Sequence, residues 1–521
     1  MRLVTGCCFA VLAGLTLVGS ALGARDLGTR AAWPGGTAVV TYESEAALAA
    51  ALERHPARVV RRVRSLRVAS LRPSGSVERF AQEIAAEPGI VRVERTSPRR
   101  SLDEPALVSF PNGLPYQWQF AAVRANEIPP EVARAAAAFT IAVIDTGADL
   151  TAPDLSAKEP QTYSVRTRQA DIPDTNGHGT FVAALAAGSS TNGDGIAGVG
   201  GEAGLLIVQA GGPGGAFTDV DEAAAIVYAV DHGAKIVNLS LGGPTTSSIE
   251  RRAVEYAASK GVLLVAAVGN GYLRGNAVEY PAALLQPVGS NGVGGRGLSV
   301  GASTPQGSRA PFSSTGSHVS LAAPGTGVFS AVSSASSTSS YPRTALAGSL
   351  AGLYGFSSGT SFASPQVAGA AAVVWAANPT LRADEVASVL EQTASGQGDW
   401  NPELGFGVLD VAAAVAKARV TQSSPPVVAP PTPIRVQLHG KRVGTRVALW
   451  WRTSGDVATF RVSVRSGHGP QRVLTPTATR RSAAYALAGG AYTFTVTGLD
   501  ADGRQLAVSA PWTVTVPRAR R

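Results

Sequence analysis

Cysteine is almost absent from this chain. Only two of its 521 residues are cysteines, Cys7 and Cys8, and both lie at the extreme N-terminus. We therefore expect no thiol and no disulfide in the rest of the protein. Charged residues are also few, 16% against 45% hydrophobic residues. Such a chain can bury a large core, and its length predicts more than one domain.

Long lipophilic runs are missing beyond the N-terminus. Residues 1–24 carry Arg2, an apolar run from Phe9 to Val18 and small residues at the end, a pattern typical of a secretory signal peptide. No later run is long and lipophilic enough to cross a bilayer. Cys7 precedes the apolar run instead of following it, which disfavours a lipoprotein. We expect a secreted protein, extracellular or in the periplasm or cell envelope, with no transmembrane segment.

The formal net charge of +9 is unevenly distributed. Residues 25–100 carry a net charge of +6, residues 101–420 carry −9, and residues 421–521 carry +11. Because the central region is acidic, the overall basic charge does not indicate a nucleic-acid partner. The basic flanks are either ordinary solvated surface or docking surfaces. In the last region, contact with a polyanionic cell surface would involve Arg461, Arg465, Arg472, Arg480 and Arg481.

One stretch near residue 360 organises the central region. Ser-Ser-Gly-Thr-Ser-Phe-Ala-Ser-Pro starts at Ser357 and leads into an uncharged apolar run that ends at Ala377. This run predicts a buried helix with Pro365 in its first turn, where a missing N–H costs little. Ser361 then lies at the helix N-terminus, where free N–H groups stabilise an anion. Taken alone, Ser361 is more simply a helix cap than a nucleophile.

Two further motifs favour the nucleophile. Residues 141–147, Ile-Ala-Val-Ile-Asp-Thr-Gly, predict a buried parallel strand with Asp145 at its C-terminal end, where open α/β sheets bind ligands. His178 opens a second apolar helix in Asn-Gly-His-Gly-Thr. The order Asp, His, Ser is one of the known orders of the catalytic triad.

With these motifs the chain resembles the subtilase family of subtilisin-like serine proteases. The matching pieces stand in family order between about Gln117 and Val415. They are Asp-Thr-Gly at 145–147, His-Gly-Thr at 178–180, Asn-Leu-Ser-Leu-Gly-Gly at 238–243, Val-Gly-Asn at 268–270, Ala-Pro-Gly at 323–325 and Gly-Thr-Ser-Phe-Ala-Ser-Pro at 359–365. The resemblance implies a serine endopeptidase that hydrolyses proteins or peptides, with Ser361 as nucleophile, His178 as base and Asp145 as its orienter.

The resemblance also implies the remaining parts of the site. Asn270 would donate to the oxyanion together with the Ser361 N–H, although an asparagine before Gly271 is also a common turn. Ser240, Leu241 and Gly242 would pair with an extended substrate, with the Gly-rich residues 211–215 as the other rail. Ala267, Val268 and Gly269 would line a pocket with room for a bulky apolar side chain.

Metal binding is a weaker expectation. Residues 189–199 lie where many subtilases bind calcium, and Asn192 and Asp194 supply hard oxygen ligands. The same Asn-Gly-Asp-Gly sequence is an ordinary turn, which we consider slightly more favoured. The chemistry itself requires no cofactor.

The flanking regions predict separate domains. Residues 37–98 read as β-α-β-β-α-β, with Ser44 capping the first helix, and resemble the inhibitory propeptide of subtilases, which would act as an intramolecular inhibitor of the peptidase domain at 112–420. A processing site is expected within residues 101–115. Residues 330–356 resemble an insertion that could wall the cleft. A Pro-rich linker at 421–433 precedes an all-β sandwich at 434–518, similar to fibronectin III or immunoglobulin-like domains.

The fold class expected is thus α/β, a subtilisin-like parallel sheet with helices on both faces, between a small α+β propeptide and a β-sandwich. Two alternatives are open. A sedolisin-like acid peptidase would use a glutamate as base, which the intact His-Gly-Thr disfavours. A non-catalytic scaffold would have lost a triad residue, and none is lost.

Overall fold

The computed structural model describes residues 33–102, 116–193, 195–337, 341–344, 352–422, 435–453, 457, 459–467, 469–478, 482–499 and 505–517. The chain divides into two compact units, Met1–Ser423 and Ser424–Arg521. The expected signal peptide, residues 423–433 of the linker and residues 103–115 of the expected processing region lie outside the described residues, as do Asp194, Arg480 and Arg481. No helix within these ranges combines the length and apolarity needed to span a bilayer.

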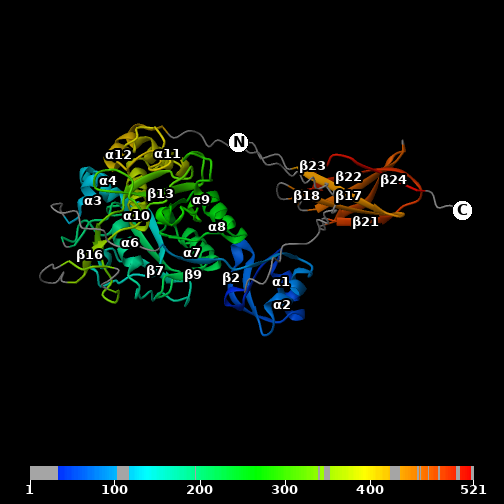
Figure 1. Cartoon of the computed structure of the whole chain (residues 1–521), viewed down its shortest axis with the longest axis horizontal. Coiled ribbons are helices and arrows are strands. Elements are labelled where there is room, and N and C mark those ends of the chain that lie inside the picture. Colours follow the sequence, from blue (N-terminus) through cyan, green and yellow to red (C-terminus); the bar gives the residue numbers. More distant parts are fainter. Residues whose placement is uncertain are drawn as a thin grey trace, which may run out of the picture. The chain divides into compact units, whose positions relative to one another are not determined.

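The N-terminal part of the first unit is a small α+β domain (blue in Figure 1). Its sheet has the order β2-β3-β1-β4, with antiparallel pairing throughout. Ser44 caps the first helix by accepting a hydrogen bond from the Ala47 N–H at 3.1 Å, as predicted. The element order β-α-β-β-α-β is confirmed: β1 Ala38–Tyr42, α1 Glu45–Arg54, β2 Ala57–Val63, β3 Val68–Pro73, α2 Val77–Ala85 and β4 Ile90–Arg95.

A seven-stranded parallel sheet forms the centre of the first unit, in the order β14-β13-β12-β10-β6-β8-β7. Both faces of the sheet are buried, because Ile141 and Val143 enter one core cluster while Ala142 and Ile144 enter another. Parallel strands buried on both faces have the near-continuous apolar sequences seen here. The strands are β6 Thr140–Asp145, β7 Gln161–Ser164, β8 Gly204–Gln209, β10 Ala234–Leu239, β12 Leu263–Ala267, β13 Gly297–Ser303 and β14 Leu321–Pro324.

Helices cover the two faces, as Figure 1 shows, so the predicted α/β fold is confirmed. One core cluster is filled from α6 His178–Ala187, α10 Thr360–Ala377, α11 Ala383–Thr393 and α12 Val411–Val420. The other is filled from α7 Asp219–Asp231 and α8 Ser248–Ser259. Shorter helices are α3 Trp118–Ala122, α4 Pro130–Ala135, α5 Pro153–Ser156 and α9 Ala282–Leu285.

Two small antiparallel sheets lie outside the main one. The first has the order β11-β5-β9, formed by Leu241–Gly242, Pro98–Ser101 and Ala216–Thr218. The second pairs β15 Val328–Ala331 with β16 Tyr354–Ser357. Between β15 and β16, the described residues contact the segments around α6. Ser333 donates to the Asp174 carbonyl at 2.6 Å, and the rings of Phe181 and Tyr341 lie 5.6 Å apart.

The second unit consists of two antiparallel sheets, which confirms the predicted all-β class (orange to red in Figure 1). Along β18 every second residue is buried, including Val447, Leu449 and Trp451, because one face of the strand packs on the core. One sheet contains β17 Val436–Val443, β18 Arg446–Thr453 and β21 Ser482–Ala486. The other contains β19 Thr459–Ser466, β20 Gln471–Ala478, β22 Gly490–Leu499, β23 Gln505–Val508 and β24 Trp512–Val516.

Candidate active site

Asp145 and His178 form a buried pair at the C-terminal end of strand β6. The Asp145 Oδ1 and His178 Nδ1 atoms lie 2.7 Å apart, and both side chains are only 1% exposed. A carboxylate at this nitrogen favours the imidazole tautomer protonated on Nδ1, which leaves Nε2 as the basic nitrogen. The Asp145 carboxylate is itself oriented by the Thr146 N–H, which donates to Oδ1 at 2.8 Å.

The histidine helix approaches β6 closely because small residues surround His178. Gly177 caps α6 at φ 97°, a conformation that favours glycine. A methyl group at Gly179 would come within 2.2 Å of the Gly147 carbonyl oxygen. The glycines on either side of His178 therefore permit the contact between the first turn of α6 and the Asp-Thr-Gly turn.

Asp174 is a positioning residue that the sequence reading missed. Its buried carboxylate accepts hydrogen bonds from the Thr146 hydroxyl and the Gly177 N–H, each at 2.8 Å, and from the Thr180 N–H at 2.9 Å. It thereby ties the strand end that holds Asp145 to the helix start that holds His178. The available signal was an acidic residue four positions before the histidine in Asp-Thr-Asn-Gly-His.

Ser361 is the second residue of α10 and is fully buried. Its Oγ makes no hydrogen bond to any atom of the described residues. The ring of the next residue, Phe362, lies 5.7 Å from the His178 ring, so the serine turn and the histidine turn are neighbours. The start of a long helix supplies free N–H groups and a positive dipole end beside the hydroxyl.

Pro365 was expected in the first turn of this helix, and that prediction is wrong. α10 begins at Thr360, so Pro365 lies in the second turn and has no N–H for the Ser361 carbonyl. The Ser240 hydroxyl donates to that carbonyl at 2.7 Å instead. Ser240 in turn accepts from the Asn238 amide at 2.9 Å, and Asn238 accepts from the Ser364 hydroxyl at 2.7 Å. This buried network connects β10 to the serine turn.

Asn270 follows β12 and reaches the same helix start. Its Oδ1 accepts hydrogen bonds from the Thr360 N–H and the Thr360 hydroxyl, each at 2.9 Å. With the oxygen held there, the amide nitrogen points to the other side, and the residue is 6% exposed. A methyl group at Gly359 would lie 3.4 Å from the Asn270 Nδ2, so the amide nitrogen is close to the turn that leads into Ser361.

Of the two segments expected to bind an extended substrate, Leu241–Gly242 pairs with a strand of the same chain, and on its other side that strand pairs with β9, which begins just after the Gly-rich residues 211–215. β5 lies antiparallel between β11 and β9, with Ser101 opposite Leu241 and Arg100 opposite both Gly242 and Ala216. The Ser101 N–H also donates to the Gly215 carbonyl at 3.0 Å. The end of the N-terminal domain thus runs along the two rails toward Ser361.

The expected side-chain pocket has small, buried residues at the end of β12. Ala267, Val268 and Gly269 are buried. Leu102 is 2% exposed, and a methyl group at Gly242 would approach the Leu102 Cδ2 to 2.9 Å and Glu279 Oε2 to 2.6 Å. Glu279, absent from the sequence prediction, borders the pocket as well, because a methyl group at Gly269 would approach the Glu279 Cγ to 3.3 Å.

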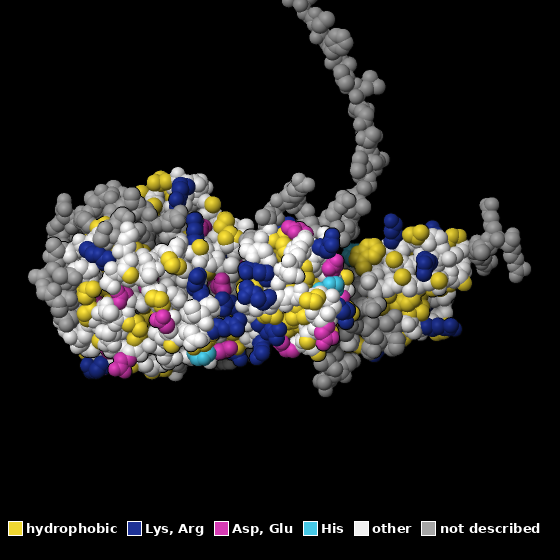
Figure 2. Space-filling view, turned by 90° about the horizontal axis from the view of Figure 1, so that it is seen from below, with side chains coloured by type: hydrophobic (Ala, Val, Ile, Leu, Met, Phe, Trp, Pro, Cys, Tyr) yellow, Lys and Arg dark blue, Asp and Glu magenta, His cyan; other side chains and the backbone are white. Residues whose placement is uncertain are grey.

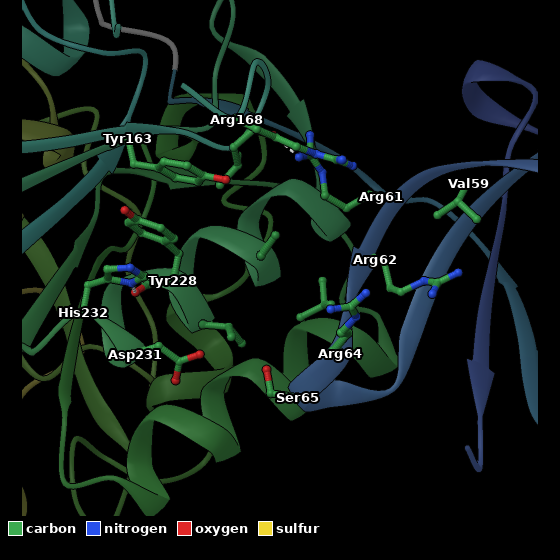
Figure 3. Close-up of a pocket in the computed structure, with 14 residues that line it drawn as sticks. Val59, Arg61, Arg62, Arg64, Ser65, Tyr163, Arg168, Tyr228, Asp231 and His232 are labelled. Carbon is green, nitrogen blue, oxygen red and sulfur yellow. Dashed lines mark hydrogen bonds between the residues drawn. The ribbon is translucent and has the colours of Figure 1, made fainter. Parts of the chain in front are cut away.

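The N-terminal domain also contacts helix α7 through charged groups. Arg61 pairs with Asp221 of α7 at 2.7 Å and donates to the Val165 carbonyl, while Arg168 donates to the Val60 carbonyl at 3.3 Å. Figure 3 shows these arginines beside the stacked rings of Tyr163, Tyr228 and His232, in a cavity of about 620 Å³. Figure 2 shows several Lys and Arg side chains close together on one face of the described residues.

Of the two expected calcium ligands, Asp194 lies outside the described residues, and the surroundings of Asn192 are polar. Asn192 approaches Asp154 with its amide nitrogen at 3.5 Å, and Asp154 is otherwise held by the Ile196 N–H at 2.9 Å and the Tyr354 hydroxyl at 2.6 Å. Burial raises the pKa of Asp154. Within the described ranges, no three His, Cys, Asp or Glu side chains converge as metal ligands. The donor set around Asp154 thus favours hydrogen bonding, and the calcium expectation stays a prediction.

Comparison with protein families gives two matches. The subtilase family profile matches residues 136–407, and the profile of the fervidolysin N-terminal prodomain matches residues 30–95. The first covers just over half of the chain, and it contains Asp145, His178, Asn270 and Ser361.

Individual proteins agree with this assignment. The thermophilic serine proteinase of Bacillus sp. (strain AK1) is 36% identical over 273 residues, 52% of this chain and 60% of that protein. Thermitase of Thermoactinomyces vulgaris is 35% identical over 50% of this chain and 83% of its own length. The crystal structure of fervidolysin from Fervidobacterium pennivorans, described as a keratinolytic enzyme related to subtilisin, matches 92% of this chain and 76% of its own at 23% identity and a TM-score of 0.64. That last likeness supports the fold.

Proposed function

This chain belongs to the subtilase family of serine proteases, and we propose on that basis that it is a secreted endopeptidase that works through an acyl-enzyme. The observation that carries the proposal is the 2.7 Å contact between Asp145 and His178 at the end of β6, next to the start of α10 at Ser361. A weak hydroxyl nucleophile needs a base within reach and an orienter behind that base.

In the proposed first step, Ser361 Oγ attacks the carbonyl carbon of the scissile peptide bond while His178 Nε2 takes its proton. The carbonyl electron pair moves onto oxygen, where the Asn270 amide and the Ser361 N–H donate to it. The C–N bond then breaks and His178 gives its proton to the leaving amine. Asp145 stabilises the imidazolium and remains ionised.

The second step reverses the roles. Water attacks the acyl carbon, His178 takes a proton from this water, and the ester bond to Ser361 breaks. The proton returns to Ser361 Oγ as the carboxylate product forms. No step passes through a metal ion. If calcium binds near Asn192 and Asp154, its role is structural, because the ion would hold that loop in one conformation.

The first substrate is proposed to be the chain itself. β5 leads from the N-terminal domain along β9 and β11. Continuing its register by one residue places Leu102 opposite Ser240, whose hydroxyl contacts the Ser361 carbonyl at 2.7 Å. The bond that follows Leu102 is then the one presented to Ser361. After cleavage, the N-terminal domain would stay bound as an inhibitor.

Fluorophosphonate labelling of the purified secreted protein tests this function. The reagent should phosphonylate Ser361 Oγ with loss of fluoride, and a tryptic peptide containing residue 361 should carry the added mass. Ser361→Ala is the matched control and should stay unlabelled. A wild-type protein that is folded but unlabelled, and that cleaves no casein, would reject the proposal.

The C-terminal unit is proposed to hold the enzyme on polyanionic polymers through its excess of arginine. Removing residues 434–521 should then spare cleavage of small peptides while lowering retention on heparin or polyphosphate resin. Equal retention of both forms would reject this role.

A further inference from the structure

Arg99 is the most unusual residue of β5, because a charged side chain on a connecting strand is fully buried. Its side chain is 0% exposed. In the register given above, Arg99 is the fourth residue before the bond that follows Leu102, and it lies opposite Phe217 of β9. Its neighbour Arg100 is exposed. Burial therefore distinguishes two adjacent arginines in one short strand.

Two glutamates from different helices receive the Arg99 guanidinium. Glu222 of α7 lies 2.8 Å from Nε, and Glu250 of α8 lies 2.8 Å from Nη2, with both carboxylates 0% exposed. The same pocket includes Asp219, whose charge also acts on Arg99. The Arg99 Nη1 donates to the Pro98 carbonyl at 3.0 Å. A planar guanidinium matches two carboxylates on separate edges, whereas an ammonium presents one point charge.

The pocket is built to accept a long side chain from the strand. A methyl group at Gly243 would approach Arg99 Nη1 to 2.9 Å and the Pro98 carbonyl oxygen to 2.8 Å, so the missing side chain at 243 leaves the entrance open. The pKa of Glu222 is raised mainly by burial and further by the charge of Glu250. Burial also raises the pKa of Glu250 and Asp219, against the opposing effect of Arg99.

A pocket of this kind discriminates strongly. Truncating one partner of a buried, hydrogen-bonded charge pair leaves the other charge uncompensated, which costs far more than a lost surface contact. A glutamine or leucine in the place of Arg99 would leave two buried glutamates facing no cation. A separate peptide substrate could place an arginine in this pocket as β5 does, because β5 is held by backbone pairing that any extended peptide can make.

We propose that Glu222 and Glu250 form an acidic subsite that selects arginine at the fourth residue before the bond to be cut. The inference rests on the proposed peptidase function and names the substrate class for the same cleft: extended segments with arginine at that position and an apolar residue just before the bond. Arg99 occupies the subsite as the first such residue.

Tetrapeptide p-nitroanilides test the subsite with wild-type mature enzyme. Arg-Arg-Ser-Leu-p-nitroanilide is compared with three peptides whose first residue is Lys, Gln or Leu. The kcat/KM should be at least 10-fold higher for Arg than for Gln or Leu, with Lys between them. Values within twofold of one another overturn the inference while leaving the peptidase function intact. Hydrolysis of none of the four, together with failure of fluorophosphonate labelling, contradicts the proposed function itself.

Substitutions then assign the preference to its residues. In Glu222→Gln and Glu250→Gln, the ratio of kcat/KM for the Arg and Gln peptides should fall to below threefold. Glu255→Gln is the matched control, since Glu255 lies on the same α8 helix but is 56% exposed and pairs with Arg296, and it should keep the wild-type ratio. Preservation of the ratio in both pocket variants would assign the preference elsewhere and overturn the inference.

Inhibition of the wild-type enzyme by product peptides tests the subsite without any substitution in the enzyme. Pro-Arg-Arg-Ser-Leu with a free carboxylate should inhibit wild-type enzyme at least 10-fold more strongly than Pro-Gln-Arg-Ser-Leu. The peptide Pro-Arg-Gln-Ser-Leu, altered at the position of the exposed Arg100, should inhibit within about threefold of the parent peptide. An equal loss from both changes would indicate general charge attraction and would overturn the inference.

Discussion

The two ends of β5 meet very different surroundings. At the Ser361 end, Leu102 is buried beside Gly242, and Glu279 borders both Gly242 and Gly269. At the other end, Arg99 is enclosed by carboxylates from α7 and α8. The first pocket is formed by residues of the sheet and its strand ends. The second is formed by helices that cover one face of that sheet.

This difference separates two tasks within one cleft. Apolar pockets discriminate weakly, because one methylene changes transition-state binding by only about 1–3 kcal/mol. A buried charged pocket rejects a wrong side chain much more strongly, because its own polar groups remain unpaired. We therefore expect the Leu102 end to tolerate many apolar residues and the Arg99 end to determine which segments are cut.

The largest effect is expected for Ser361→Ala, which removes the chemistry and leaves both pockets filled. Loss of the nucleophile costs about 10⁶-fold in kcat in subtilisin. The fold should be unaffected, because the Ser361 hydroxyl makes no hydrogen bond to any described atom. Intact mass of the secreted variant, made in a protease-deficient host, should show residues from about Arg25 onward still attached. Trimming as complete as in wild type would mean that another protease matures the chain or that Ser361 is not the nucleophile.

Arg99→Gln in the Ser361→Ala background tests the acidic end without cleavage. The uncut chain should lose about 3–5 kcal/mol of stability, because two buried glutamates face no cation. Thermal unfolding followed by circular dichroism should show a lower Tm. Arg100→Gln is the control and should change Tm little, since Arg100 is exposed. Equal Tm values for the two variants would show that the buried pair contributes nothing special.

Asn270→Ala tests the chemical end in the active enzyme. We expect kcat to fall about 100- to 1,000-fold, the loss found for the oxyanion asparagine of subtilisin, with little change in KM. Release of the N-terminal domain should be slow but complete. The Arg-to-Gln preference at the acidic subsite should persist in this variant, and its loss would mean that the two ends are not independent.

The acidic subsite should depend on pH. The raised pKa values of Glu222, Glu250 and Asp219 mean that these carboxylates accept protons at higher pH than ordinary ones. Protonation removes the charge that attracts arginine, so the Arg-to-Gln ratio should fall as pH is lowered and rise as it is raised. The ratio of kcat/KM for the two peptides, measured across mildly acidic to mildly alkaline pH, cancels effects on His178. A ratio independent of pH would contradict this prediction.

The smallest effect concerns docking of the whole N-terminal domain. Its net charge of +6 faces a region of net charge −9, and Arg61 pairs with Asp221. The association rate of the separated domain with mature enzyme should fall about 10-fold from low to high salt. Stopped-flow fluorescence can follow this rate, and Arg61→Gln should reduce its salt dependence. A rate indifferent to ionic strength would exclude steering.

Sequence reasoning reached those features that depend on local pattern. Apolar runs separated by glycine-rich turns predicted the parallel sheet, and alternation along residues such as Val447 and Leu449 predicted the sandwich. The positions of Asp145 and Ser361 followed from strand-end and helix-start chemistry, and their proposed roles stay predictions.

Long-range pairing was beyond that reasoning. Glu222 and Glu250 lie in two different helices, and each is more than 100 residues from Arg99 in sequence. Only the crossing of α7, α8 and β5 brings them together. Pro365 was assigned to the first turn of its helix for the same reason, because the hydroxyl that satisfies the Ser361 carbonyl comes from Ser240, far away in the sequence.

The buried ion pairs of Arg99 affect how soon the enzyme becomes active after cleavage. When the chain is cut after Leu102, the new carboxyl end can leave only if the guanidinium also leaves its two glutamates. Under the proposed function, the clipped domain therefore has a long residence time on the enzyme. The interval between synthesis and full activity is then governed by dissociation, so that a protease made inside a cell would begin general digestion only after it has travelled away from its origin.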